Sequence, residues 1–259
     1  MSRVRTYRTQ SVVLRRIDFG EADRILTLFT QTEGKVKAIA KGVRRIASRS
    51  SGHLELFAHS DVLFAQGRDL DVVTQAETIR SFRALREDLL GTAHAYYLAE
   101  LVDALTEERQ PNPRLFTTLV QALAALDDSF DPRLVVSHFI LSALDATGFR
   151  PQVTECVLCR TPLRPEMNGF DRALGGAVCP RCSPAAVGAR PIAVNVLKLL
   201  RLLQRTERVV DLGVRVPLDV SREAERLLRE YAEGILEHQL RAPAFVARVR
   251  EVTAAYQLG

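Results

Sequence analysis

Short runs in which apolar and polar residues alternate fill the first 80 residues of the chain. Five such runs occur, at residues 9–14, 24–30, 36–40, 54–65 and 70–77. Glu33-Gly34-Lys35 supplies a tight turn between the second and third runs, and Gly67-Arg68-Asp69 joins the last two. A period of two residues is typical of half-buried strands. The pattern predicts five strands, for which a small barrel of the oligonucleotide/oligosaccharide-binding (OB) arrangement is the first candidate; other five-stranded barrels also satisfy it.

After Arg80 the apolar period lengthens to three or four residues, which predicts amphipathic helices. The expected helices cover residues 85–105, 115–126, 132–147, 192–204, 221–240 and 243–256. Pro111 and Pro113 separate the first two, Gly148 ends the third, and Ser221 is the expected N-cap of the fifth. The sequence thus predicts an α+β multidomain protein. Its expected parts are a barrel over 1–80, a helical domain over 81–150 and 189–259, and an insertion over 151–188.

All four cysteines lie in that insertion, as Cys156-Val-Leu-Cys159 and Cys179-Pro-Arg-Cys182. Each C-x2-C turn lets two thiolates approach one ion from the same side, and two such turns complete a tetrahedral, closed zinc site. Turns at Asn168-Gly169 and Gly175-Gly176 are expected to fold the intervening segment into a hairpin. The spacing therefore predicts one structural Zn²⁺. Two disulfides and metal-free buried thiols are the alternatives, and neither suits clustered cysteines in a reducing compartment.

The N-terminal part of the chain is strongly basic. The first 52 residues carry 12 Lys or Arg against four acids, a local charge of +8, whereas the remaining residues sum to −3. Segregated positive charge usually indicates a polyanionic partner, although a solvated basic surface is the plainer alternative. The residues expected to contact DNA phosphates are Arg15, Arg16, Arg24, Lys35, Lys37, Lys41, Arg44, Arg45 and Arg49. Rings for stacking on bases would come from Tyr7, Phe19 or Phe29, unless these pack in the core.

The motifs of common catalytic sites are missing from the sequence. There is no phosphate-binding G-x-x-x-x-G-K-[ST] loop, no G-x-G-x-x-G turn, no H-E-x-x-H pair and no G-x-S-x-G elbow, and the five histidines are scattered. We therefore expect a binding protein and not an enzyme. A zinc-ribbon enzyme that processes nucleic acid, with the barrel holding its substrate, remains the alternative, and a pure protein-interaction adaptor is a third possibility.

Size and compartment follow from length and composition. With 259 residues, 47% of them hydrophobic and 26% charged, the chain is expected to form two or three structural units of an ordinary globular protein. The N-terminus does not have the apolar run of a secretory signal, and no apolar stretch reaches the roughly 18 residues that a membrane span needs. We expect a cytoplasmic, nucleoid-associated protein.

Several stretches of the sequence resemble one protein family. The string from Gln10 to Ile46, QSVVLRRIDFGEADRILTLFTQTEGKVKAIAKGVRRI, is similar to the N-terminal signature of the bacterial DNA repair protein RecO family. Residues 96–109, 113–127 and 139–160 resemble, in that order, the helical segments of the family and the entry to its zinc-binding element. The resemblance covers about residues 1–240. It implies an OB-fold, a helical domain and a zinc finger, and some relatives lack the cysteines.

The resemblance also implies a function. Members of the family bind single- and double-stranded DNA, anneal complementary strands, and act with RecR, and with RecF, to help load recombinase onto strands covered by single-strand-binding protein. Contact with the acidic, phenylalanine-ended tail of single-strand-binding protein is implied as well. Lys198, Arg201 and Arg205, on one side of a leucine-rich helix, are the expected site for that tail, with a solvated helix face as the alternative.

Overall fold

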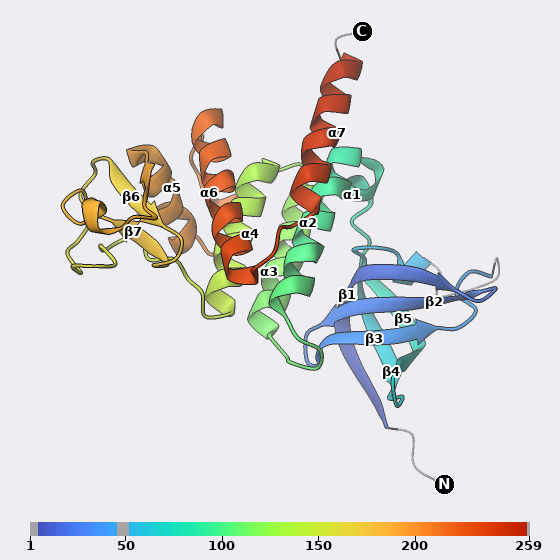
Figure 1. Ribbon diagram of the computed structural model, residues 1–259. Coiled ribbons are helices and arrows are strands. Elements are labelled where there is room, and N and C mark those ends of the chain that lie inside the picture. The colour runs from blue at the N-terminus through green and yellow to red at the C-terminus, as the bar shows by residue number, and fades with distance from the viewer. Residues whose placement is uncertain (1–4, 46–51, 258–259) are drawn as a thin grey trace. The chain divides into compact units, whose positions relative to one another are not determined.

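A computed structural model describes residues 5–45 and 52–257, and the side chains up to residue 254 (Figure 1). The chain folds into two compact units. The first contains the residues up to Asp128 together with those from Ala242 onward, and the second runs from Ser129 to Arg241. None of the helices within the described residues is both long enough and apolar enough to cross a membrane.

The N-terminal strands form a closed barrel, which confirms the predicted fold class. Its strands are β1 (Thr6–Phe19), β2 (Asp23–Thr30), β3 (Gly34–Ala40), β4 (His59–Ala65) and β5 (Asp71–Arg80). They follow one another around the barrel in the order β1-β2-β3-β5-β4, and all pairs are antiparallel except the short β3–β5 pair. Leu54, expected to begin the fourth strand, instead ends a 3-10 turn, Gly52–Leu54.

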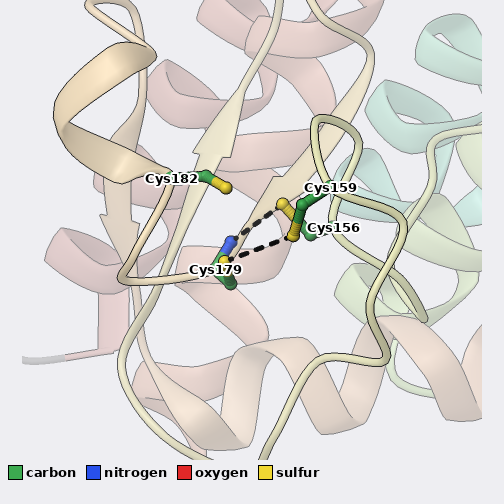
Figure 2. A group of neighbouring side chains, drawn as sticks. All are labelled: Cys156, Cys159, Cys179 and Cys182. Carbon is green, nitrogen blue, oxygen red and sulfur yellow. Dashed lines mark hydrogen bonds between the residues drawn. The ribbon is translucent and has the colours of Figure 1, made fainter.

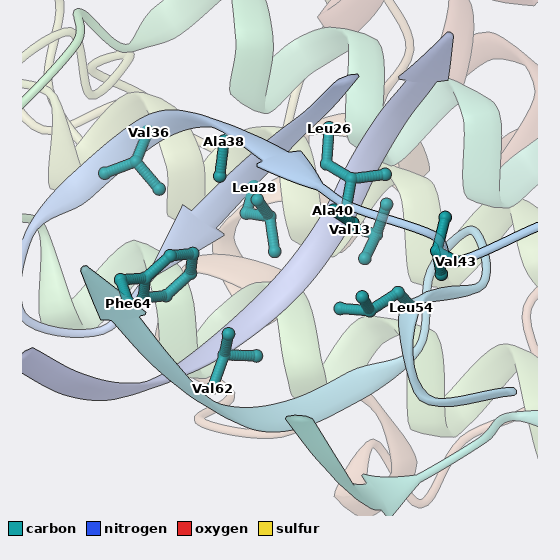
Figure 3. Packing of buried hydrophobic residues seen from close by; sticks show 10 residues of the cluster. All are labelled: Val13, Leu26, Leu28, Val36, Ala38, Ala40, Val43, Leu54, Val62 and Phe64. Carbon is teal, nitrogen blue, oxygen red and sulfur yellow. The ribbon is translucent and has the colours of Figure 1, made fainter. Parts of the chain in front are cut away.

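Alternation along the strands fills the barrel interior. Leu26 and Leu28 of β2 lie beside Ala38 and Val36 of β3 and point into the barrel, where Phe64 of β4 belongs to the same cluster (Figure 3). All of these side chains are almost completely buried. Burying one Leu or Phe side chain stabilises a fold by about 1.5–3 kcal/mol, so this cluster holds the barrel closed. The intervening residues of β2 and β3 consequently face outward.

The loop between α2 (Leu89–Leu105) and α3 (Pro113–Asp127) is fixed to the barrel. The Arg109 N–H donates to the Lys35 carbonyl oxygen at 2.9 Å, and the Arg109 guanidinium donates to Asp71 at 2.5 Å. Asp71 is 1% exposed and also accepts a hydrogen bond from the Tyr7 hydroxyl. Burial, reinforced by that hydrogen bond to a carboxylate, raises the pKa of Tyr7. One buried carboxylate thus joins β1, β5 and the α2–α3 loop.

Gly34, at the start of β3, is where this loop comes closest. Its φ of +68° is left-handed, and a Cβ added there would lie 2.1 Å from the Gln110 carbonyl oxygen. We expect Gly34→Ala to lower the free energy of unfolding by at least about 3 kcal/mol, because a methyl group would have to push the loop off the barrel. Gly20→Ala is the matched control, since Gly20 has a similar φ of +57° with no atom within 4 Å of the added Cβ. Urea denaturation of both variants measures the difference, and equal losses would contradict a loop-packing role for Gly34.

The remaining helices of the first unit are α1 (Arg83–Glu87) and α7 (Ala242–Gln257). The helix expected over residues 85–105 is broken at Asp88, whose extended backbone ends α1 and whose carboxylate caps α2 at the Gly91 N–H, 2.5 Å away. Helix α7 packs against α2 through Val246, Val249 and Ala93. The last helix therefore belongs to the same unit as the barrel, whereas the sequence grouped it with residues 189–241.

The second unit combines three helices with a small sheet. The helices are α4 (Pro132–Ala146), α5 (Val194–Arg205) and α6 (Leu218–Leu236). The strands are β6 (Asn168–Asp171), β7 (Gly176–Val178) and β8 (Arg190–Ile192), in the antiparallel order β7-β6-β8, and Ser183–Ala185 and Val209–Asp211 are 3-10 turns.

Two local expectations fail in the second unit. Helix α6 begins at Leu218 directly after Pro217, so Ser221 lies buried inside its first turn, donating to the Leu218 carbonyl oxygen, and is not the N-cap. Pro217 sets this start, because a proline is favoured at a helix entry and supplies no N–H. Asn168-Gly169 forms part of strand β6 and not a turn; the chain reverses over Arg172–Gly175 instead.

Candidate nucleic-acid interface and metal centre

The four cysteines come together between two short loops (Figure 2). Their sulfur atoms all lie within 4.8 Å of one another, and the Cys159 and Cys179 sulfurs are 3.8 Å apart. Each loop is closed by its own backbone: the Arg160 N–H donates to the Cys156 carbonyl and the Cys182 N–H to the Cys179 carbonyl. The Val157 N–H donates to the Ala177 carbonyl at 3.0 Å and joins the first loop to β7. The two C-x2-C pairs therefore come together, as their spacing predicted.

This geometry and its electrostatics fit a metal ion. Four thiolates at the Zn–S distance of about 2.3 Å from one tetrahedral zinc ion have sulfurs about 3.8 Å apart. The hydroxyl and N–H of Thr161 lower the pKa of Cys159 to about 5, whereas hydrogen bonds to the Cys159 and Cys179 sulfurs raise the pKa of Cys182 to about 12. Four sulfurs this close cannot all ionise without a cation between them. The cysteines can thus hold one metal ion in a closed, structural site.

Helix α5, which was expected to bind a partner, is hydrogen-bonded to the cysteine-bearing segment. The guanidinium of Arg201 in α5 donates to the Val153 carbonyl at 2.7 Å and to the Leu163 carbonyl at 3.3 Å. Its donors therefore hold the cysteine-bearing segment to α5. Lys198 and Arg205 are exposed on the same helix, so only these two of the three expected residues present their charge to solvent.

The basic residues of the barrel separate onto two faces. Arg16 and Arg24 lie on the side of β1 and β2 that also carries the core residues. There both guanidinium groups bind Glu55, and Arg24 also binds Asp18 at 3.0 Å. Lys35 is 11% exposed, and its ammonium group donates to the Asp103 carboxylate at 2.8 Å. These three cations thus have acidic partners inside the first unit, which the sequence alone did not reveal.

The other expected cations lie on the outer face or in the turn after β3. Register places Arg15, Thr27 and Lys37 side by side across β1, β2 and β3. Arg15 and Lys37 are half-exposed or more; the partner of Arg15 is the partly exposed Asp103, at 3.9 Å, and the partner of Lys37 is the exposed Glu108. Such exposed pairs contribute only about 0–1 kcal/mol, so both cations can exchange partners.

The turn after β3, residues 41–45, is called the basic turn here. Lys41 and Arg45 are exposed and form no ion pair among the described residues. Arg44 binds Asp18 at 3.5 Å, and its N–H donates to the Ala22 carbonyl, which holds the basic turn against the β1–β2 hairpin. Arg49 lies outside the described residues.

A row of aliphatic side chains, unexpected from the sequence, crosses the same outer face. Register aligns Ile17, Ile25, Ile39 and Val72 across β1, β2, β3 and β5, and Ile17 is 55% exposed. Phe19 follows on β1 with 52% exposure. We call Arg15, Thr27, Lys37, the aliphatic row and Phe19 the outer face. The alternation at residues 15, 17 and 19 and at 25 and 27 was the signal that could have predicted it.

Two of the three candidate stacking rings pack against other side chains of the protein. Phe29 is completely buried and packs against Phe116 of α3, with ring centroids 6.2 Å apart. Tyr7 is half-buried, stacks on Phe64 and is hydrogen-bonded to Asp71. Of the three rings, only Phe19 offers an accessible face.

Comparison with known proteins fits this architecture. The family model for the N-terminal part of recombination protein O matches residues 1–82, and the model for its C-terminal part matches residues 86–244. The chain belongs to the RecO family. In this RecO-family chain the first match ends just after β5, and the second begins within α1.

Curated relatives of the chain are named DNA repair protein RecO. One from Roseiflexus sp. (strain RS-1) is 40% identical over 250 residues, which cover 96% of this chain and 88% of the relative. One from Symbiobacterium thermophilum is 35% identical, and the match covers 94% of this chain and 98% of the relative. One from Dehalococcoides mccartyi (strain BAV1) is 33% identical, and the match covers 93% of this chain and 95% of the relative. The similarity to these RecO proteins thus extends through both compact units.

Proposed function

We propose that this RecO-family chain acts in DNA repair and recombination by binding DNA on the outer face and the basic turn. The observation that carries the proposal is the position of this surface. In OB-folds, oligonucleotides bind the face of strands 2 and 3, and here that face presents Lys37 and a partly exposed aliphatic row beside the basic turn.

The chemistry of the surface suits a single strand. Lys37, Lys41 and Arg45 are available to phosphates, while Phe19 and the aliphatic row provide apolar contacts for bases. Thr27 is the polar uncharged side chain of the outer face, so few groups can read the hydrogen-bonding edges of bases. A DNA strand that is held mainly by its phosphates leaves the hydrogen-bonding edges of its bases free to pair with the complementary strand. The surface therefore supports weakly sequence-specific binding of single- and double-stranded DNA and annealing of complementary strands.

The proposed role is that of a mediator and involves no covalent step. The chain would act with RecR, and with RecF, to load recombinase onto strands coated by single-strand-binding protein. Lys198 and Arg205, beside the exposed Leu202 of α5, remain our proposed contact for the acidic tail of that protein. Zn²⁺ held by the four cysteines would supply structural cross-linking of the second unit.

A salt titration of the full-length protein with labelled single-stranded DNA tests the binding proposal. If roughly six phosphates are neutralised, the logarithm of affinity should fall with the logarithm of salt concentration at a slope of about −4. Weak binding with little salt dependence would favour a protein-interaction adaptor. Cleavage or modification of the DNA with Mg²⁺ present, abolished by one carboxylate substitution, would favour the zinc-ribbon enzyme.

A further inference from the structure

Three arginines of the second unit surround one glutamate where β6, β8 and α6 meet. Arg172 follows β6, Arg190 begins β8, and Arg226 lies on α6, one turn before Glu230. Each guanidinium group has a nitrogen 3.7 Å from a Glu230 carboxylate oxygen. Arg172 and Arg190 approach the same oxygen, so those two nitrogens lie within twice that distance of each other.

The arginines are attracted to Glu230 but not bound tightly to it. A separation of 3.7 Å exceeds the hydrogen-bonding range, and none of the three guanidinium groups forms a hydrogen bond within the described residues. Each guanidinium has five N–H donors, and the exposed fractions run from 44% for Arg172 to 68% for Arg190. The three positive charges thus share the Glu230 carboxylate as their ion-pair partner, and most of their donors form no hydrogen bond within the described residues.

A cavity of about 40 Å³ opens among these side chains. Its lining includes all three arginines, the two carboxylates Glu223 and Glu230, and the apolar side chains Phe170 and Leu227, so the cations exceed the acids by one. A water molecule needs about 10–15 Å³ by this kind of measure, so the cavity admits a few waters or one oxyanion but no aromatic ring. Phe170 is buried and closes the floor by packing on Tyr231, with ring centroids 5.7 Å apart.

We propose that this arginine cluster is a second oxyanion site, which takes a backbone phosphate of nucleic acid. The inference rests on the proposed DNA-binding function and deepens it, because it adds a contact point on the second unit. Glu230 keeps the three guanidinium groups together when no phosphate is present and competes with the phosphate for them. A phosphate offers several oxygens at once and can accept hydrogen bonds from more than one planar guanidinium.

A nucleic-acid phosphate fits the cluster better than a peptide carboxylate does. A peptide that ends in a large apolar residue needs an apolar pocket for that side chain, and this cavity is too small for a ring. A strand, by contrast, can lay one phosphate in the cavity and leave its bases in solvent. The exposure of Arg190 and Arg226, 68% and 58%, leaves the approach open.

Substitutions in the full-length protein separate this site from the barrel surface. With single-stranded DNA, the triple variant Arg172→Ala, Arg190→Ala, Arg226→Ala should bind roughly tenfold more weakly at low salt, with a slope shallower by about 0.7–1.4, the contribution of one or two phosphates. Glu230→Gln should bind more tightly, roughly threefold, because the competing charge is removed while the side-chain shape remains. Arg222→Ala, an exposed arginine on the same helix without an ion pair among the described residues, is the matched control and should match wild type.

The outcomes distinguish this inference from the proposed function. If wild type does not bind DNA, the proposed function fails. If wild type binds and the triple variant keeps its affinity and slope, only the arginine site fails. Weakened binding by Glu230→Gln would also overturn the inference, since it would show that Glu230 serves folding and not competition. Arginine side-chain NMR spectra titrated with inorganic phosphate give a second reading: shifts confined to Arg172, Arg190 and Arg226 support the site, and unchanged signals contradict it.

Discussion

Replacing Lys37, Lys41 and Arg45 by glutamate should reduce the affinity for single-stranded DNA by about 100-fold or more at low salt. Three phosphate contacts would be lost, which makes the salt slope shallower by about 2, and three new negative charges would repel the strand. The fold should survive, because Lys37 has only an exposed ion pair with Glu108, and Lys41 and Arg45 form none among the described residues. Fluorescence anisotropy over a salt series measures the effect, and an annealing assay with complementary oligonucleotides should show a parallel loss.

A charge-matched variant distinguishes local contact from net charge. Arg68, Arg83 and Arg248 are also exposed residues of the first unit, and replacing them by glutamate changes the total charge by the same amount. This second variant should keep most of its affinity and the wild-type slope. Equal losses in the two variants would show that long-range charge governs binding and that the outer face with its basic turn is not the contact surface.

The barrel could be predicted from the sequence because its signal is local. Strand count, turns and the alternation of buried residues such as Leu26 and Leu28 are all contained in runs of a few residues. The face of each arginine could not be predicted in the same way. The pairing between β1 and β2 shifts register between Val13 and Arg15, so Arg16 lies on the same face as the core residue Val13 and Arg15 on the opposite face. Alternation counted from Val13 predicts the reverse.

Partners distant in sequence account for most of the other differences. Lys35 is neutralised by Asp103, 68 positions later, and Arg201 is held by carbonyl groups of the segment before and after Cys156. Neither contact has a local pattern, so both residues looked like free surface cations. The cysteine site could be predicted because each of its two pairs is local and the chemistry of four thiolates leaves few alternatives.

Removing the metal should have the largest effect on the second unit. Replacing Cys179 and Cys182 by serine should abolish zinc binding and lower the melting temperature of this unit by more than about 10 °C, because a structural zinc site contributes many kcal/mol of folding free energy. Ser183→Ala, beside the second loop but without a metal ligand, should retain zinc and melt like wild type. Metal analysis and calorimetry of the three proteins measure this; an unchanged melting transition in the metal-free variant would contradict a structural role.

DNA binding by the metal-free variant tests whether both units contact the DNA strand. The barrel belongs to the first unit and does not depend on the cysteines, so most of the affinity should remain. Arg172 and Arg190, however, are carried by the segment around β6 and β8, whose position depends on the metal loops through contacts such as Val157 with Ala177. The cysteine variant should therefore show the same shallower salt slope as the triple arginine variant. A full loss of binding would instead place the main DNA contacts on the second unit, and a slope identical to wild type would remove the phosphate contact assigned to the arginine cluster.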